Sequence, residues 1–221
     1  MQQKKQKISL NEIELFKNLK NDSLKKINDN SQLKKYEKNK ILFFVGDKSD
    51  TFFIVLEGKV KIFRSSSKGR EKILKKMIKG DFFGEMGIIE DKPRSATAVV
   101  EEESTLLLIS KNEFLHLLKN SSQLALNLIV DLSKRLRRAD KDIEDLAFFS
   151  VEMRLKKFFR ENGERLKGKE KYYYLDKDYT HQELANYLGS SRETITRIFN
   201  RLESQGIVEY KDKKIILKYE E

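Results

Sequence analysis

Four polar residues near the C-terminus have the types and the spacing needed to recognise DNA bases. The apolar residues Ile195, Ile198, Phe199 and Leu202 predict a helix from Arg192 to about Ser204. Positions four and five apart share a helix face, so Arg192, Glu193, Thr196 and Arg197 lie together on the exposed one. Arginine can bond guanine O6 and N7 together, and glutamate can accept from cytosine N4. The alternative is an ordinary charged helix surface with i,i+4 ion pairs.

A preceding short helix would hold these four residues in a helix-turn-helix. Thr180 and Glu183 have the spacing of a capping box, with threonine as N-cap and glutamate at the third helical position. Gly189 suits a turn that needs a positive φ, and Ser191 can cap the second helix. Two helices joined by so short a turn predict a helix-turn-helix, and residues 207–217 predict the hairpin of a wing. This context favours base reading over the surface alternative.

A heptad pattern precedes the helix-turn-helix. Its apolar positions, spaced alternately by four and three residues, are Ala125, Ile129, Leu132, Leu136, Ala139, Ile143 and Leu146. Charged residues lie between them, and the pattern lasts three heptads, which is typical of a two-stranded coiled coil. We therefore expect this helix to form a homodimer interface, the alternative being an amphipathic helix packed on its own domain.

The N-terminal half has the texture of a small β-barrel or roll behind short helices. Residues 8–35 contain two short apolar-periodic stretches that predict helices. Residues 36–109 contain short apolar runs separated by glycine turns, which predict strands. The expected class is α+β, with an effector-sensing β-roll and its N-terminal helices at residues 1–120. A dimerisation helix at 121–149 and a winged helix-turn-helix at 150–221 complete the expected domains.

Composition narrows the possible functions. The 221 residues include no cysteine, so disulfide, iron–sulfur and thiolate–zinc chemistry is excluded. The net charge is +11, but residues 151–221 hold 16 Lys and Arg against 13 Asp and Glu, a net of +3, so charge alone does not establish DNA binding. No apolar run reaches membrane-spanning length and no signal peptide is evident, so we expect a cytoplasmic protein without membrane contact.

The sequence resembles the cyclic-AMP receptor protein family of bacterial transcription regulators, which includes the fumarate–nitrate reductase regulators. Residues 189–197, Gly-Ser-Ser-Arg-Glu-Thr-Ile-Thr-Arg, resemble its recognition-helix signature, and Leu-Ala-Phe at 146–148 resembles the end of its dimer helix. The resemblance covers nearly the whole chain, and it implies that the β-roll at residues 1–120 is of the cyclic-nucleotide-binding type. It implies that Arg192, Glu193 and Arg197 read a TGTGA-like palindromic half-site in double-stranded DNA, whereas the family varies at Thr196. It also implies an activator that touches RNA polymerase, although repression from an overlapping site is equally physical.

A second resemblance is to the phosphate-binding cassette of the same family. Residues 83–88 read Phe-Gly-Glu-Met-Gly-Ile, and after five residues 94–100 read Arg-Ser-Ala-Thr-Ala-Val-Val. Arg94 can neutralise a cyclic phosphate while Ser95 donates a hydrogen bond, and a turn of helix at Gly84 would aim N–H groups at the anion. Glu85 would accept from the ribose 2′-hydroxyl. The alternative is a structural ion pair between Glu85 and Arg94.

One departure from the family bears on the identity of the effector. The receptor protein has a Thr-Ser pair on the dimer helix that touches adenine, where this chain has Ala139 and Asp140. Asp140 can accept from adenine N6 or from guanine N1 and N2, or it can be a solvated flank of the coiled coil. We expect cyclic AMP as the allosteric ligand, with cyclic GMP as its nearest competitor. The alternative is the same DNA-binding regulator acting with another effector or with none.

The resemblance and the chemistry together define two sets of ligand-binding residues. The effector is expected to contact Gly84, Glu85, Met86, Arg94, Ser95, Ala96 and Asp140. DNA is expected to contact Ser191, Arg192, Glu193, Thr196 and Arg197. The tyrosine-rich residues 172–175, expected in a loop, lie near the activating contacts of relatives, with buried packing as the alternative.

Catalysis, metal binding and haem sensing find little support. The chain has two histidines, His116 and His181, and neither has an evident nucleophile as partner. No metal-ligand spacing is present. His181 falls in the first turn of a capped helix, where the dipole disfavours its charged form, and His116 lies in an apolar helical stretch. We therefore expect neither an enzyme nor a metalloprotein. A kinase or channel subunit would lack the helix-turn-helix.

Overall fold

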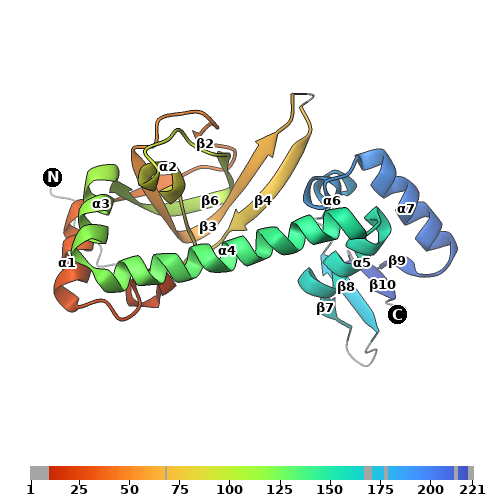
Figure 1. Cartoon of the computed structure of the whole chain (residues 1–221). Coiled ribbons are helices and arrows are strands. Elements are labelled where there is room, and N and C mark those ends of the chain that lie inside the picture. Colours follow the sequence, from red (N-terminus) through yellow and green to blue (C-terminus); the bar gives the residue numbers. More distant parts are fainter. Residues whose placement is uncertain (1–9, 68, 167–170, 177–178, 212–213, 219–221) are drawn as a thin grey trace. The chain divides into compact units, whose positions relative to one another are not determined.

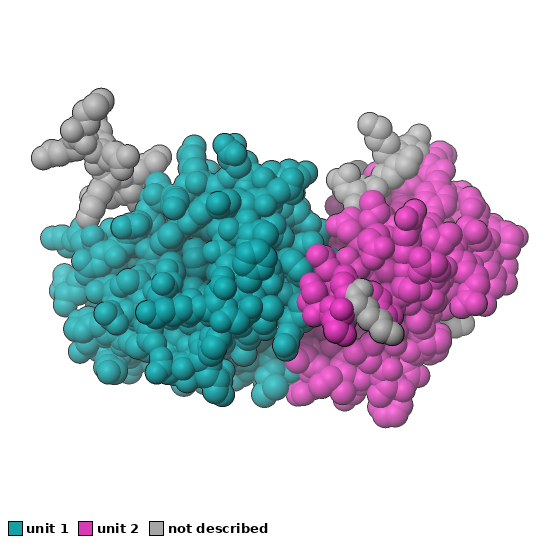
Figure 2. All heavy atoms as spheres, turned by 90° about the horizontal axis from the view of Figure 1, so that it is seen from above, with its two compact units in different colours: residues 1–64, 73–137 teal, residues 65–72, 138–221 magenta. Residues whose placement is uncertain are grey.

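The computed structural model describes residues 10–67, 69–166, 171–176, 179–211 and 214–218 (Figure 1). The expected α+β class is confirmed, with an N-terminal β-domain, a long helix and a C-terminal helix-turn-helix. The chain divides into two compact units (Figure 2). The first comprises residues 1–64 and 73–137, and the second comprises residues 65–72 and 138–221. Within the described residues, no helix has the length and apolar character needed to cross a membrane.

The first unit is built on an antiparallel sheet. Its strands are β1 (Ser31–Tyr36), β2 (Ile41–Phe43), β3 (Thr51–Ser65), β4 (Glu71–Met77), β5 (Phe82–Phe83) and β6 (Thr97–Ser110). The main order is β1-β6-β3-β4, with β2 added to β6 and β5 added to β3. One face buries an aromatic cluster of Phe43, Phe53 and Phe83, whose rings pack 5.0 to 6.1 Å apart. This cluster surrounds the site described below.

Helices cover the other face of the sheet. The short 3₁₀ helices η1 (Leu10–Glu12) and η2 (Glu14–Phe16) and the helix α1 (Asn21–Asn30) pack with α3 (Lys111–Asn120) and the start of α4 (Ser122–Phe148). Phe52 of β3 stacks on Phe114 of α3 with ring centroids 4.1 Å apart. The first part of α4 is anchored in this core by Leu124 and Leu128, which are both buried.

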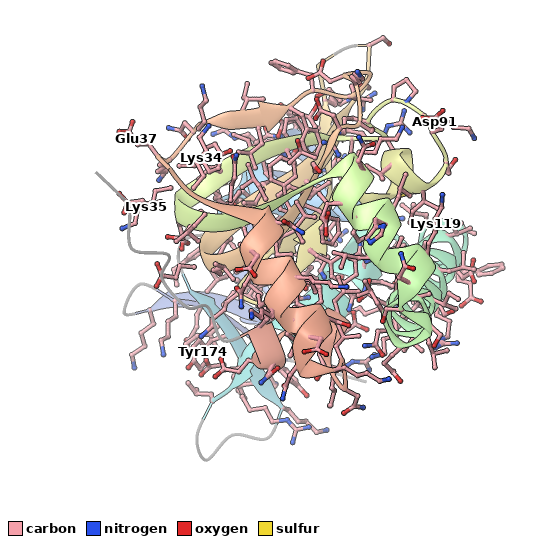
Figure 3. All side chains as sticks on the ribbon, turned by 90° about the vertical axis from the view of Figure 1, so that its left-hand side faces the viewer. Lys34, Lys35, Glu37, Asp91, Lys119 and Tyr174 are labelled. Carbon is pink, nitrogen blue, oxygen red and sulfur yellow. The ribbon has the colours of Figure 1, made fainter. Side chains whose placement is uncertain are left out.

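The N-terminal helical region ends earlier than the sequence pattern predicted. The prediction of helices within residues 8–35 is wrong for its last part, because Leu33 lies in β1 and pairs with Leu107 of β6. Strand pairing with β6 overrides the weak local helical pattern, because residues 31–36 find a complete hydrogen-bonding partner there. The exposed charged side chains of Lys34 and Lys35 on β1 project from this edge of the sheet (Figure 3). Charged side chains of this kind disfavour pairing with another chain.

Gly58 permits a sharp irregularity in β3. The register of β3 on β6 shifts on both sides of this residue, and its φ is +83°. A Cβ at this position would lie 2.2 Å from the carbonyl oxygen of Glu103. Only glycine fits so close an approach of two backbones. The bulge therefore depends on this one residue type.

The second unit contains the helix-turn-helix. Its elements are α5 (Val151–Asn162), β7 (Glu164–Arg165), β8 (Tyr172–Asp176), α6 (His181–Leu188), α7 (Arg192–Ser204), β9 (Val208–Lys211) and β10 (Lys214–Lys218). The sheet order is β7-β8-β10-β9, and all of its pairs are antiparallel. The predicted wing hairpin is present as β9 and β10, while its turn at 212–213 lies outside the described residues.

The prediction of a loop at 172–175 is wrong. These residues form most of β8, and each pairs with a residue of β10. Tyr173 and Leu175 are buried in the core of the second unit, as the packing alternative expected. Lys214 lies over the ring of Tyr174, with Nζ 3.6 Å from the centroid. Three successive tyrosines show no alternation of polar and apolar residue types, so the sequence did not reveal the alternate burial that the strand has.

Candidate effector site and nucleic-acid interface

The first part of the cassette is a tight turn from β5 into the short helix α2 (Glu85–Ile89). Gly84 stands between them in the left-handed conformation, with φ of +87°. A Cβ on Gly84 would lie 2.6 Å from Nη1 of Arg94 and 3.1 Å from the carbonyl oxygen of Thr51. Both the backbone conformation and the close approach of the guanidinium therefore require glycine.

Arg94 lies inside the β-domain, with 4% of its surface exposed. Its Nη1 donates to the carbonyl oxygen of Gly84 at 2.9 Å, and its Nη2 donates to that of Thr51 at 2.6 Å. Its guanidinium carbon lies 4.2 Å from the ring centroid of Phe43 and 5.7 Å from that of Phe53. Carbonyl oxygens and aromatic faces thus hold the cation in one orientation. Its Nε is buried and has no hydrogen-bond partner among the described residues.

Glu85 is the second buried charge, with 1% of its surface exposed. Its Oε1 accepts a hydrogen bond from Nη1 of Arg135 at 2.9 Å, and its Oε2 has no partner in the described part of the chain. Burial raises the pKa of Glu85 above its ordinary value, although Arg135 acts in the opposite direction. Glu85 and Arg94 do not form the structural ion pair that was the alternative. Glu85 pairs with Arg135, whereas Arg94 donates to backbone carbonyl oxygens.

Arg135 of α4 is the residue that sequence reasoning missed. Besides Glu85, it contacts the carboxylate of Asp131 and donates from Nη2 to the carbonyl oxygen of Phe82 at 2.9 Å. Its guanidinium carbon lies 4.6 Å from the ring centroid of Phe82. The sequence offered only the i,i+4 spacing of Asp131 and Arg135, which is common on charged helices. Through Arg135, the long helix α4 is tied directly to the cassette.

The other residues predicted to contact the effector lie in different surroundings. Met86 and Ser95 are exposed, and the hydroxyl of Ser95 lies 3.8 Å from the sulfur of Met86. Ala96 is buried in the core of the β-domain. Asp140 is exposed on α4 and belongs to the second unit. The structure thus brings Gly84, Glu85 and Arg94 together and places Met86 and Ser95 at the surface beside them.

The heptad positions of α4 differ in exposure along the helix. Ile129, Leu136 and Ile143, spaced by seven residues, are 58%, 63% and 65% exposed. Ala139 and Leu146 are also exposed, whereas Ala125 and Leu132 are half-buried. Leu132 packs partly against the core of the first unit. An apolar stripe of this length on a single chain is characteristic of a surface that another protein surface covers.

The helix-turn-helix is built as the sequence predicted. Thr180 accepts from the backbone N–H of Glu183 at 3.1 Å, and the Glu183 carboxylate accepts from the N–H of Thr180 at 3.2 Å, which completes the capping box. Gly189 ends α6 with φ of +63°. Ser191 caps α7 by accepting from the N–H of Thr194 at 3.1 Å. The residues Leu184, Ala185, Leu188, Ile195, Ile198, Phe199 and Leu202 are buried.

The expected DNA-reading residues lie on the outer side of α7. Arg192, Glu193 and Arg197 are exposed, and Ser191 and Thr196 are half-buried. The backbone N–H at the helix start and the Ser191 hydroxyl hold the pKa of Glu193 below its ordinary value, so this carboxylate stays an acceptor at neutral pH. Thr196 differs from the others, because its hydroxyl lies 3.0 Å from Nδ1 of His181.

Comparison with known proteins identifies the domains that contain these two candidate sites. Residues 33–121 match the family model of the cyclic nucleotide-binding domain, and residues 154–221 match that of the Crp-like helix-turn-helix domain. The fold and these domains define a DNA-binding transcription regulator with a cyclic nucleotide-binding domain. The chain belongs to the cyclic-AMP receptor protein and fumarate–nitrate reductase regulator family.

Individual relatives support this assignment. The cyclic AMP receptor protein of Thermus thermophilus is 33% identical over 181 residues, covering 80% of this chain and 79% of that protein. The cAMP-activated global transcriptional regulator Vfr of Pseudomonas aeruginosa is 29% identical over 188 residues, covering 83% and 88%. These relatives are regulators rather than enzymes.

Solved structures share the fold. The c-di-GMP responsive global regulator CLP of Xanthomonas campestris aligns with a TM-score of 0.77 at 24% identity, covering 91% of this chain and 100% of that one. The catabolite activator protein of Thermus thermophilus aligns with a TM-score of 0.56 at 29% identity, covering 93% of each chain. Related regulators thus respond to different nucleotides, according to their names.

Proposed function

We propose that this protein is a homodimeric cytoplasmic transcription activator whose affinity for DNA is controlled by cyclic AMP. The observation that carries the effector assignment is a pair of buried atoms in the cassette, Oε2 of Glu85 and Nε of Arg94, which have no hydrogen-bond partner among the residues that the structure describes. A buried polar atom without a hydrogen bond costs free energy, so the site is built for a group that supplies both a donor and an acceptor. A ribose 2′-hydroxyl supplies the donor for Glu85, and a cyclic phosphate supplies the negative acceptor for Arg94.

The base of the nucleotide is assigned to a contact with α4. Asp140 is exposed, carries an acceptor and follows Ala139, which has no polar side-chain atom. Its carboxylate accepts from adenine N6 in the favoured complex. Guanine N1 and N2 are the competing donors, which makes cyclic GMP the nearest competitor.

The dimer is proposed to form along the exposed heptad stripe of α4. Ile129, Leu136 and Ile143 occupy one heptad position, and each exposes more than half of its side chain in the single chain. Pairing this stripe with that of a second copy removes these side chains from water, at about 1.5–3 kcal/mol for each fully buried one. The repeat of seven residues selects a two-stranded coiled coil.

DNA reading is proposed for the outer face of α7. Arg192 and Arg197 bond guanines, Glu193 accepts from cytosine, and Ser191 contacts the backbone at the helix start. In a symmetric dimer the two helices read half-sites about 34 Å apart, so the target is a palindrome with TGTGA-like half-sites. Contact with RNA polymerase from the bound dimer would then activate transcription.

The effector is coupled to DNA binding by a population shift. A ligand changes DNA affinity only if it binds the DNA-competent state better than the other state. Glu85 is the physical link, because its Oε1 accepts from Arg135 of the dimer helix while its Oε2 faces the proposed ribose. A group that engages Glu85 therefore acts on α4 through one side chain.

Fluorescence anisotropy of a labelled TGTGA-type palindrome tests this function. The full-length protein is titrated at fixed salt without nucleotide, with cyclic AMP and with cyclic GMP. Tighter binding with cyclic AMP than in the other two titrations supports the proposal. Tighter binding with cyclic GMP reassigns the effector, and equal affinity in all three supports the alternative of a regulator that acts without a cyclic nucleotide.

A further inference from the structure

We propose that His181 is a positioning residue for DNA recognition, which fixes the recognition helix α7 and the wing strand β9 through hydrogen bonds to Thr196 and Tyr210. The proposal rests on the DNA-binding function and adds to it a set of residues that do not themselves read bases. It assigns the hydroxyl of Thr196 to the imidazole of His181 rather than to a base edge.

The imidazole of His181 links three elements, namely α6, α7 and β9. His181 is the first residue of α6, and its Nδ1 lies 3.0 Å from Oγ1 of Thr196 on α7. Its Nε2 lies 3.0 Å from the hydroxyl of Tyr210 on β9. The imidazole also stacks on Phe199, with centroids 4.6 Å apart and planes 27° apart. Both ring nitrogens are therefore used, and the ring cannot rotate without losing a bond.

The surroundings favour the neutral imidazole. Burial lowers the pKa of His181, and the guanidinium of Arg192 on α7 lowers it further. The N-terminus of α6 acts in the same direction, because the helix dipole is positive there. The carboxylate of Glu183, two residues along α6, is engaged by the capping box. On the β9 side, burial and Glu203 raise the pKa of Tyr210, so its phenol keeps its proton.

A neutral imidazole has one donor and one acceptor, so the directions of its two bonds are linked. A phenolic O–H is the more acidic of the two hydroxyls and is the stronger donor. We therefore assign Tyr210 as the donor to Nε2 and the Nδ1–H of His181 as the donor to Thr196. Protonation of the ring would turn Nε2 into a donor and would remove the bond from Tyr210.

On α7, the residues proposed to read bases therefore differ from the residue proposed to position the helix. The three exposed residues Arg192, Glu193 and Arg197 carry the groups that match base edges. Thr196 is half-buried and sets the rotation of that face relative to the wing. Its loss should weaken binding to all sequences alike, because every base contact depends on the same helix placement.

Histidine NMR of the full-length protein tests the two hydrogen bonds of His181 without DNA. The chain contains two histidines, so His116→Gln assigns the ring signals of His181 directly. The expected result is a neutral ring at pH 7 with the proton on Nδ1. Tyr210→Phe should raise the pKa of His181, because it removes a donor to the neutral ring. A ring that titrates identically in the wild type, Tyr210→Phe and Thr196→Val overturns the proposal.

DNA selection tests the assigned role of Thr196. Full-length protein with cyclic AMP selects from a duplex pool randomised across both half-sites, and the bound fraction is sequenced. Thr196→Val and Tyr210→Phe should each weaken binding roughly 2- to 12-fold, the range for one hydrogen bond of about 0.5–1.5 kcal/mol. The selected bases should stay those of the wild type, and Thr196→Ser should retain wild-type affinity.

The two experiments fail in different ways. A changed base preference at one position in Thr196→Val makes Thr196 a base reader and overturns the proposal. Unchanged affinity in both Thr196→Val and Tyr210→Phe also overturns it. A wild-type protein that selects no sequence contradicts the proposed function instead, and the NMR titration still tests the two hydrogen bonds of His181. Thermal unfolding of each variant confirms that the affinities refer to folded protein.

Discussion

Arg135 of the long helix donates to Glu85 of the phosphate-binding cassette, with Nη1 and Oε1 2.9 Å apart. Both side chains are also constrained by their surroundings. Glu85 is nearly inaccessible, and Arg135 also holds the carbonyl oxygen of Phe82 and the carboxylate of Asp131. This ion pair therefore joins the stability of the β-domain to the position of the helix on which the dimer is proposed to form.

Glu85→Gln should stabilise the ligand-free protein at neutral pH while weakening cyclic AMP binding. Burial raises the folded-state pKa of Glu85, so the folded protein binds a proton more readily than the unfolded chain does. The stability that this group contributes is thus present at low pH and is lost as pH rises through the folded pKa. Glutamine stays neutral, so thermal unfolding from pH 4.5 to 8 should show a gain for the variant that grows with pH. A variant less stable than wild type at pH 8 would contradict the net effect of burial.

Arg94→Gln should remove the response to cyclic AMP and should also destabilise the β-domain. The variant loses two hydrogen bonds from a buried charged donor and the stacking on Phe43, a loss of about 3 kcal/mol or more. Arg64→Gln, at an exposed position of β3, is the matched control and should have little effect. Calorimetric titration with cyclic AMP measures binding, and chemical unfolding measures stability. Wild-type affinity in Arg94→Gln would exclude this residue from the effector site.

Ile143→Asp should dissociate the proposed dimer. It places a charge near the C-terminal end of the exposed stripe, in a position that a two-stranded coiled coil would bury on both chains. The loss should be at least about 3 kcal/mol of association free energy, because two apolar side chains are replaced. Lys134→Asp, at an exposed charged position of the same helix, is the control. Sedimentation equilibrium distinguishes monomer from dimer, and equal association of both variants would place the interface elsewhere.

Arg197→Ala should relax the preference for one guanine and should cost about 1–3 kcal/mol of DNA binding. The side chain is exposed on the outer face of α7, so its removal leaves the core intact. Arg201→Ala is the control on the same helix, because Arg201 pairs with Glu152 of α5. Binding to a series of single-base-substituted duplexes measures the effect. An unchanged preference at every position would remove the base-reading role from Arg197.

Local signals in the sequence were sufficient for the parts of the fold that depend on neighbours along the chain. The capping box of Thr180 and Glu183, the left-handed Gly189 and the heptad of α4 all follow from residues within one or two turns of one another. The placement of residues 31–36 and 172–176 in strands depends on partners far away in β6 and β10. No local pattern specifies such partners.

In the candidate sites, too, the local motifs were predictable from the sequence and the distant partners were not. Gly84, Glu85 and Arg94 were recognised by motif, and the structure brings them together. Their actual partners were not predictable, because Arg135 lies 50 residues from Glu85 and the carbonyl oxygen of Thr51 lies 43 residues from Arg94. The contact between His181 and Thr196 likewise depends on how α6 and α7 cross, which spacing alone does not fix.

The contacts that hold the guanidinium of Arg94 have a thermodynamic consequence for effector binding. Two carbonyl oxygens and two aromatic rings of the chain itself hold the guanidinium in place. A preorganised cation loses little rotamer freedom when an anion arrives, so the entropic penalty of binding is small at this residue. The nucleotide should therefore enter a rigid receptor, and conformational entropy lost on binding should come from elements other than the cassette.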